Sequence, residues 1–583
     1  MSFEDVIRAA QGKLPFDIAV KNVRLVNVMT AEIYDTDIGI LGNKISFVGE
    51  MKNFEAGEVF DANGMYAVPG LIDSHLHVES SMITPPKFAE AVLPRGITTV
   101  AIDPHEIANV LGKEGVRLML ETSRDLPLKV FILIPTCVPA MPNVETAGAE
   151  LLAQDVAEML QWERVLGEAE LMDYFGVINL DKRMTDIVKV GIKANTVLDG
   201  HCMNLDDKGL NAYASIAQAN HEYFPTDPQD NYKRDFEQIR KEIRLGMYAK
   251  LRKSILLPEI ISQLNTLPNK QSILFVTDDV MPDDLVHYGH LDDVVRTAIR
   301  NGFDPVEAIQ SATLYPARFL RLFDRGVIAP GKLADMLLLE DLNQFSINTV
   351  FADGKIVAKN GKLLIGLPFR GFPQKAKETV KLQRVSASDF KVRVDKESGL
   401  AKVRVISMHD LLSTFVIKQM EVKDHMLQTD LATVAVLERH GRTRNKTLGF
   451  IEGFGLNQGA IASTVSHDSH NLVVVGMNAT DMAVATNTLI ECQGGLVAVK
   501  DTKIIAKVEL PVAGLMSEED VEKVASKVRA FRNAEEELGL EDHGTMLAIS
   551  TLALPVIPNA RITDKGLFDV SKQELLPLIV EVK

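Results

Sequence analysis

The stretch Pro69-Gly70-Leu71-Ile72-Asp73-Ser74-His75-Leu76-His77-Val78-Glu79-Ser80-Ser81 decides the fold that we expect for this chain. An apolar run leaves a Pro-Gly turn and ends in two histidines that are one residue apart. Side chains alternate between the two faces of a strand, so His75 and His77 point the same way from one strand end. Two imidazoles placed together begin a metal site, although two surface histidines on a loop are the alternative. The rest of the chain must supply further ligands if the first interpretation is right.

Length and composition describe an ordinary globular protein. The chain has 583 residues, which at about 150 residues per domain predicts three or four domains. Hydrophobic residues make up 46% and charged residues 24% of the sequence, so a sizeable core can form. The net charge of −16 disfavours a partner that is bound through a phosphate backbone, so we expect no nucleic-acid partner.

Cysteine usage and the distribution of apolar residues point to the cytoplasm. Three cysteines cannot form a disulfide framework, and the first residues do not resemble a signal peptide. No apolar run reaches the roughly 20 residues that a membrane helix needs. We therefore expect a cytoplasmic protein with no membrane partner.

Residues 67–324 alternate short apolar runs with longer helical stretches, which is typical of a parallel sheet. Eight runs end in polar residues, and they are Leu71–His77, Thr98–His105, Val130–Thr136, Glu168–Tyr174, Thr196–His201, Ala219–Glu222, Gly246–Arg252 and Ile273–Asp279. Eight such units in about 250 residues predict an α/β fold, a (β/α)8 barrel whose active site lies at the carboxyl ends of the strands. An open doubly wound sheet is the competitor, but no glycine-rich phosphate loop follows the first run.

The two flanks of this section are rich in strand-like segments, of which Asp17–Val20 and Val23–Val28 are the first two. We expect residues 1–66 and 325–375 to pair into one small β-sandwich domain. Residues 380–583 form a separate C-terminal α/β domain, in which Leu472–Gly476 is strand-like and Glu518–Glu537 is an amphipathic helix.

The other metal ligands lie where a barrel places them. Run four carries Glu170, runs five and six carry His201 and His221, and run eight carries Asp278 next to its last residue. Taken singly, each histidine could be structural, and the aspartate could be a helix N-cap. Together with the first two histidines they predict a site for two divalent metal ions, with the carboxylate of Glu170 as the bridge. Two such ions about 4 Å apart lower the pKa of a bridging water and supply hydroxide at neutral pH. Asp278 could also accept the proton of that water and pass it to the leaving group.

Several blocks of the sequence resemble the adenine deaminases of bacterial type, within the amidohydrolase superfamily. The blocks extend over nearly the whole chain and include Gly70–His77, Val78–Met82, Asp103–Gly112, Pro135–Ala140, Leu210–Tyr213, Thr277–Asp279, Gly289–Arg296 and Gly459–Asn471. The resemblance implies hydrolysis of the 6-amino group of adenine, giving hypoxanthine and ammonia. It also implies a binuclear manganese or iron centre whose ligands match His75, His77, Glu170, His201, His221 and Asp278.

The resemblance narrows the chemistry further. Many relatives in the superfamily bridge their metals with a modified lysine, whereas Glu170 stands at the matching position here, which favours the deaminases over ring-amide hydrolases. His and carboxylate ligands suit zinc, manganese and iron alike, so zinc remains possible.

Roles in proton transfer and substrate binding are predicted for the residues around the ligands. Asp278 is the proton shuttle, and His105-Glu106, at the end of run two, is the pair that protonates the purine ring, unless it is a structural loop. Glu79 and Ser80 could contact a purine base or orient the metal ligands from outside, and His105 and Asp279 are further candidates for contact with the base.

One further patch is chemically rich, His467-Asp468-Ser469-His470 in the C-terminal part. Its two histidines could bind a metal or close over the active site, or they could hydrogen-bond a turn.

The chain departs from the family pattern at Lys253 and at Val280-Met281, on the loop side of the barrel. These changes leave open an amidohydrolase that acts on a cyclic amide or on a different aminopurine. A catalytically silent relative is expected to lose ligands, and none is missing here. We expect a homo-oligomer, with a dimer as the first choice.

Overall fold

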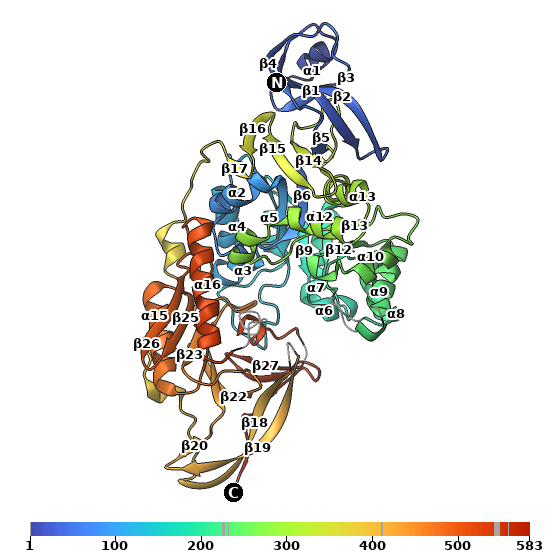
Figure 1. Cartoon of the computed structure of the whole chain (residues 1–583). Helices are drawn as coiled ribbons and strands as arrows, with labels where there is room; N and C mark the ends of the chain where they lie inside the picture. The colour runs from blue at the N-terminus through green and yellow to red at the C-terminus, as the bar shows by residue number, and fades with distance from the viewer. Residues whose placement is uncertain are drawn as a thin grey trace.

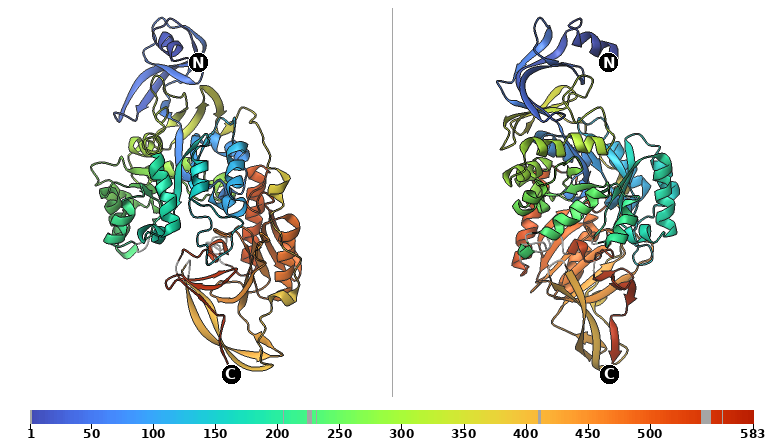
Figure 2. Two further views of the ribbon diagram at one scale, coloured as in Figure 1. Left: turned by 180° about the vertical axis from the view of Figure 1, so that it is seen from behind. Right: turned by 90° about the vertical axis from the view of Figure 1, so that its right-hand side faces the viewer.

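The molecule consists of three parts arranged along its length, a β-rich part, a central α/β part and a C-terminal part (Figures 1 and 2). A computed structural model describes them over residues 2–203, 205–223, 228–230, 232–409, 412–540, 549–557 and 559–583.

Both flanks of the central section contribute strands to one nine-stranded sheet, ordered β17-β16-β15-β14-β5-β1-β2-β3, with β4 beside β1. Its strands are β1 Phe16–Asn27, β2 Glu32–Leu41, β3 Lys44–Gly49, β4 Ala56–Asp61, β5 Tyr66–Pro69, β14 Met336–Asp341, β15 Ser346–Ala352, β16 Lys355–Lys359 and β17 Lys362–Leu363. The antiparallel pair β5–β14 joins the two flanks. Apolar side chains from both flanks, such as Val20, Ile40, Met336 and Phe351, pack in one core. Helix α1 (Phe3–Ala10) precedes this sheet.

Each of the eight predicted runs of the central section overlaps a strand. The strands are β6 Leu71–Leu76, β7 Ile97–Ile102, β8 Lys129–Pro135, β9 Val165–Leu171, β10 Val197–Gly200, β11 Ala219–Asn220, β12 Tyr248–Leu251 and β13 Ile273–Phe275. They form a curled parallel sheet in two pieces, β10-β9-β8-β7-β6 and β11-β12-β13. A parallel bridge between Leu76 and Asp278 links the two pieces at one side.

Helices cover the outside of this curled sheet (Figure 1). They are α2 Pro85–Val92, α3 His105–Leu111, α4 Lys113–Thr122, α5 Ala153–Met159, α6 Tyr174–Ile178, α7 Lys182–Ala194, α8 Asp207–Ala214, α9 Lys233–Arg244, α10 Pro258–Leu264, α11 Pro282–His287, α12 Leu291–Arg300, α13 Pro305–Ser311 and α14 Leu314–Phe319. All side chains of β6 and β7 are buried, as expected of parallel strands that are covered on both faces.

The C-terminal part contains a ten-stranded sheet and a three-stranded sheet. The strands of the first are β18 Ser398–His409, β19 Leu412–Lys423, β20 Met426–Gln428, β21 Ala432–Leu437, β22 Lys446–Glu452, β23 Ala460–Ser463, β24 Leu472–Gly476, β25 Gly495–Lys500, β26 Lys503–Glu509 and β30 Ile579–Val582, and those of the second are β27 Ala560–Thr563, β28 Gly566–Asp569 and β29 Glu574–Leu576. Helix α16 (Val521–Glu537) lies within the predicted helix Glu518–Glu537, and helix α15 (Ala479–Cys492) lies between β24 and β25. Within the described residues, no helix combines the length and apolar character that crossing a bilayer requires.

Candidate metal centre

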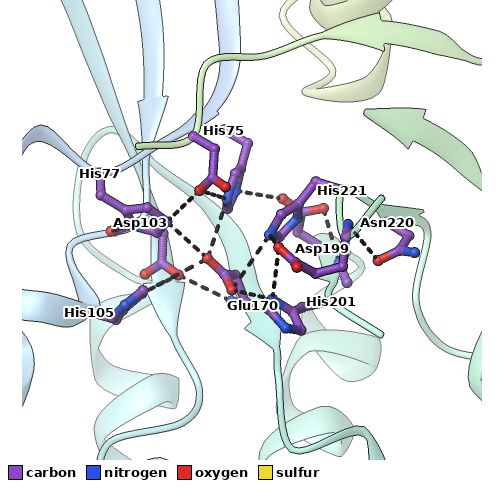
Figure 3. A network of polar contacts seen from close by, with 12 residues as sticks. His75, His77, Asp103, His105, Glu170, Asp199, His201, Asn220 and His221 are labelled. Carbon is purple, nitrogen blue, oxygen red and sulfur yellow. Dashed lines mark hydrogen bonds and ion pairs between the residues drawn. The ribbon is translucent and has the colours of Figure 1, made fainter. Parts of the chain in front are cut away.

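The first two predicted ligands meet the carboxylate of Glu170. His75 is the fifth residue of β6, and His77 immediately precedes a short 3-10 helix, Val78–Ser81. The Nε2 atoms of His75 and His77 lie 3.3 Å and 3.0 Å from Glu170 Oε1. Both side chains turn toward Glu170 from neighbouring positions, as Figure 3 shows. The alternation of side chains along a strand therefore brings the His-x-His pair to one place.

Asp278 completes this half of the cluster. Its Oδ1 atom lies 3.5 Å from His75 Nε2 and 3.2 Å from His77 Nε2. Its backbone has a φ of 59°, in the left-handed region that is uncommon for residues other than glycine. Arg252 pairs with its other oxygen, Oδ2. Burial opposes ionisation of Asp278, but Arg252 and the two histidines hold its pKa well below the usual range. Asp278 is therefore a carboxylate, able to bind a cation and to accept a proton.

The second half of the cluster faces the other oxygen of Glu170. His201 Nδ1 lies 2.9 Å and His221 Nε2 lies 3.7 Å from Glu170 Oε2. Burial is the largest influence on the pKa of His221 and, with His75 nearby, lowers it well below the ordinary value. A neutral imidazole is the form that binds metals. Glu170 thus faces two sets of ligands, one with each oxygen.

The cluster is suited to cations. Burial opposes the charge of Glu170, but His221, His201 and the first two histidines hold its pKa well below the usual range. Within the described part of the chain, neither ring nitrogen of His75 has a hydrogen-bond partner. Buried carboxylates together with unsatisfied imidazole nitrogens provide the N and O donors that divalent metals bind. The six residues fall into two candidate metal-holding groups that share Glu170.

Outer contacts orient the ligands. His77 Nδ1 lies 2.8 Å from the backbone oxygen of Asp103, and His75 Nδ1 lies 3.4 Å from Asp199 Oδ2. A proton on each Nδ1 leaves the Nε2 lone pair directed at the centre of the cluster. Asp199 is in turn paired with Lys250 on β12, and both side chains are fully buried.

The predicted substrate residues lie beside the cluster. Ser80 Oγ donates a hydrogen bond to Asp279 Oδ1, and Asp279 is exposed. Glu79 is buried, and its Oε1 accepts a hydrogen bond of 3.2 Å from the backbone N–H of Ile107. Burial and the nearby Glu106 carboxylate raise the pKa of Glu79 to about 7. Ser80 is thus a buried partner of the exposed Asp279, whereas Glu79 joins the 3-10 helix to α3.

The predicted acid pair lies on the other side of the cluster. His105 Nδ1 lies 3.9 Å from Glu170 Oε1, and its Nε2 lies 3.3 Å from Glu106 Oε1. Glu106 also pairs with His467 and His470 of the C-terminal part. Both histidines therefore contact the predicted acid pair, and His470 also accepts a hydrogen bond of 3.1 Å from the backbone N–H of Ser466 in its own turn.

Comparison with known proteins identifies the family. Residues 66–357 match the model described as the amidohydrolase family, and residues 385–574 match that described as the adenine deaminase C-terminal domain. An adenine deaminase of Moorella thermoacetica is 39% identical over 99% of this chain and 98% of its own length. Adenine deaminase 2 of Carboxydothermus hydrogenoformans is 37% identical over 99% of each chain. The chain belongs to the adenine deaminase family. Among solved structures, one of an adenine deaminase resembles 59% of this chain and 100% of its own, at 17% identity and a TM-score of 0.46.

The positions at which we expect the sequence to depart from the family pattern, Lys253 and Val280-Met281, differ in their contacts. Lys253 is largely exposed, and its Nζ lies 2.6 Å from Asp293 Oδ2, so it is engaged outside the cluster. Val280 and Met281 are partly buried and pack against the main core.

Sequence reasoning missed several residues of the cluster, among them Asp199, Lys250 and Arg252. A signal for two of them was present, because a charged residue inside a central parallel strand needs a buried partner. Lys250 stands in such a strand, Tyr248–Leu251, and Asp199 stands in Val197–Gly200. Nothing in the sequence pairs the one with the other.

Proposed function

We propose that this protein hydrolyses adenine to hypoxanthine and ammonia. The observation that carries the proposal is Glu170, whose two oxygens each face two histidines. The relatives that are named adenine deaminases, at 37–39% identity over nearly the whole chain, support adenine as the substrate.

The ligands that we propose are His75, His77, Glu170, His201, His221 and Asp278, with Glu170 as the bridge. Two divalent ions bound there supply the Lewis acidity that activates water at neutral pH. We propose manganese or iron as the natural metal, and zinc remains an alternative for the same donors.

Asp278 accepts the proton of the attacking water and returns it to the amino group, which leaves as ammonia. Its ionised state and its place between Arg252 and the two histidines of β6 support this role. Glu106 and His105 act at the ring nitrogens of the purine, one of which must gain a proton. Ser80, Asp279 and Glu79 contact the substrate, and of the three only Asp279 is exposed.

Three features of the architecture belong to the same proposal. The two pieces of the central sheet close into one (β/α)8 barrel, supported by the bridge at Leu76 and by a 2.9 Å hydrogen bond from Gln218 N to Leu198 O at the other side. The nine-stranded sheet bends into a small sandwich. The domains are 1–66 with 325–375, 67–324 and 380–583.

We also propose a cytoplasmic homodimer, for which size-exclusion chromatography with light scattering should give twice the chain mass of 64.2 kDa.

The test is turnover of adenine by the metal-loaded protein. The purified protein is stripped with a chelator, reloaded with Mn²⁺ and given adenine, and hypoxanthine and ammonia are followed separately. Equal amounts of the two products, absent in the stripped control, are expected. No turnover of adenine, together with hydrolysis of a dihydropyrimidine or a hydantoin, would show that the protein is a ring-amide hydrolase instead.

A further inference from the structure

A loop of the C-terminal part contacts a buried carboxylate of the central part. Residues 466–470 lie between β23 and β24, and Glu106 stands in the first turn of α3. His467 Nδ1 lies 2.7 Å from Glu106 Oε1, and His470 Nε2 contacts Glu106 Oε2. Both oxygens of this buried carboxylate are therefore held by imidazoles from the other part of the chain.

His470 is a neutral donor. The backbone N–H of Ser466 donates a hydrogen bond of 3.1 Å to His470 Nδ1, so that nitrogen carries no proton. The remaining N–H, on Nε2, donates to Glu106. Burial lowers the pKa of His470 to about 4, although Glu106 opposes this. His470 therefore fixes the position of Glu106 without itself carrying a transferable proton at neutral pH.

His467 differs in exposure and in charge. Its side chain is 16% exposed, against 1% for His470 and 2% for Glu106. Its Nδ1 forms an ion pair with Glu106 Oε1 at 2.7 Å, whereas its Nε2 makes no hydrogen bond or ion pair with any residue that the structure describes. Burial favours the neutral ring, but the Glu106 carboxylate outweighs it and raises the pKa of His467 to about 9. At neutral pH the ring is an imidazolium, so its Nε2 carries a proton.

His105, the other histidine beside Glu106, has both ring nitrogens engaged. Its Nδ1 lies 3.3 Å from Asp103 Oδ2, and its Nε2 lies 3.3 Å from Glu106 Oε1. It also separates Glu106 from Glu170, which is 3.9 Å from its Nδ1. One imidazole therefore lies between the Glu106–His467 pair and the proposed metal bridge, which places His467 at the edge of the same site.

We propose that the C-terminal part supplies the proton donor of the adenine site, His467, with Glu106 and His470 as its positioning residues. This inference rests on the proposed deamination of adenine. As the water oxygen bonds to C6, the electron pair of the C6–N1 double bond moves to N1, which takes the Nε2 proton of His467. The amino group leaves as ammonia with the proton held by Asp278. The C6 hydroxyl then becomes the carbonyl of hypoxanthine, and its proton returns to His467 through solvent.

The groups that face His467 set the pH range of this step. The charged and titratable groups around it are Glu106, Asp468, Asp279, His105 and His470. Loss of the imidazolium proton predicts a fall of kcat as the pH rises through about 9.

The test compares His467→Asn with the unsubstituted, Mn²⁺-loaded protein. We expect kcat for adenine to fall by ~10²–10⁴-fold, the usual contribution of a general acid, with little change in KM. The alkaline fall of kcat should disappear, and both proteins should keep the same metal content. In His467→Gly, added imidazole should restore turnover, a result that a merely structural role would not give. His425→Asn, at an exposed position of the same C-terminal part, is the control that leaves turnover unchanged.

Two results overturn the inference while adenine deamination stands. Turnover by His467→Asn within about threefold of the unsubstituted protein would exclude an acid at this position. Loss of a metal ion from the variant would mean that His105, Glu106 and His467 hold a cation. If the unsubstituted protein does not deaminate adenine, both proposals are wrong. That outcome is measured on the unsubstituted protein alone and is therefore distinct from an effect of the His467 variants. If His467→Asn does not fold, the effect of added imidazole on the turnover of His467→Gly decides whether His467 is the proton donor.

Discussion

Glu170 is the residue at which the two halves of the cluster meet. Its Oε1 faces His75 and His77, and its Oε2 faces His201 and His221. A carboxylate that is shared in this way can bridge two cations, whereas a glutamine amide offers only one oxygen and no charge.

Replacing Glu170 with glutamine should therefore remove the bridge. We expect Glu170→Gln to lose most of its bound metal and to lower kcat for adenine by at least ~10²-fold, because the hydrolytic water is no longer activated. Metal is counted by mass spectrometry after gel filtration, and turnover is measured in parallel. Glu150→Gln, at an exposed position, is the control. A Glu170→Gln protein that kept both metals and full activity would refute the bridge.

Lys250 is a second residue whose environment gives a definite expectation. Its ammonium is fully buried, pairs with Asp199 and lies 3.0 Å from the backbone oxygen of Ser74. Lys250→Met takes from the buried Asp199 charge its lysine partner and leaves only His75 Nδ1 beside it, which costs ~3–5 kcal/mol of unfolding free energy. Thermal and urea unfolding measure the loss. Lys241→Met, in an exposed pair with Asp207, should change stability by less than ~1 kcal/mol. Equal stability of the two variants would contradict the buried pair.

Residue identity could be predicted where local spacing carries the information. The closeness of His75 and His77 follows from the alternation of a strand, and the other four proposed ligands follow from their places in runs four, five, six and eight. Asp199 and Lys250 could not be paired in advance, because they are 51 residues apart and their contact depends on the curvature of the sheet.

At the scale of elements, hydrophobic patterning located the eight strands that the structure describes in the central section, including β11, which has only two residues. The pattern was less exact in the first flank. Two predicted runs, Asp17–Val20 and Val23–Val28, belong to one strand, β1, whose pairing with β2 shifts register between Val20 and Val23. The shift exchanges the faces of the strand, so the alternation of side chains breaks and imitates a turn.

The segment between β8 and α5 contains a buried acid at the contact with the C-terminal part. Glu145 is 1% exposed, and its Oε1 accepts a hydrogen bond of 3.0 Å from Met141 N. Burial, reinforced by Asp468, raises the pKa of Glu145 from 4.5 to about 8. The folded protein therefore holds this proton more tightly than the unfolded chain does.

This raised pKa gives a signed expectation for stability. The contribution of Glu145 is fully present below pH ~4.5 and is lost as the pH rises through about 8. Between these values it lowers the unfolding free energy by up to ~1.4 kcal/mol per pH unit. Glu145→Gln should therefore show a flatter decline of melting temperature from pH 5 to 8 than the unsubstituted protein, as measured by calorimetry. Parallel declines in the two proteins would show that Glu145 does not titrate in this way.

At the scale of the whole molecule, the three-part organisation follows from patterning, whereas the meeting of the parts does not. The β-rich flanks, the alternating middle and the α/β C-terminal part are each visible as periodicity. The contact of Glu106 with His470 joins residues 364 positions apart. No local pattern specifies such a contact, and for this reason the His467–His470 patch supported several readings from sequence alone.

The central claim is that two metal ions, held by six residues of the central part, make this protein an adenine deaminase. The most direct measurement is a titration of the metal-free protein with Mn²⁺, with the initial rate of hypoxanthine formation recorded at each addition. The rate should be near zero without metal, rise with added Mn²⁺ and reach a plateau at about two equivalents per chain, as a binuclear site requires. A plateau at one equivalent, or a rate that does not depend on Mn²⁺, would contradict the account.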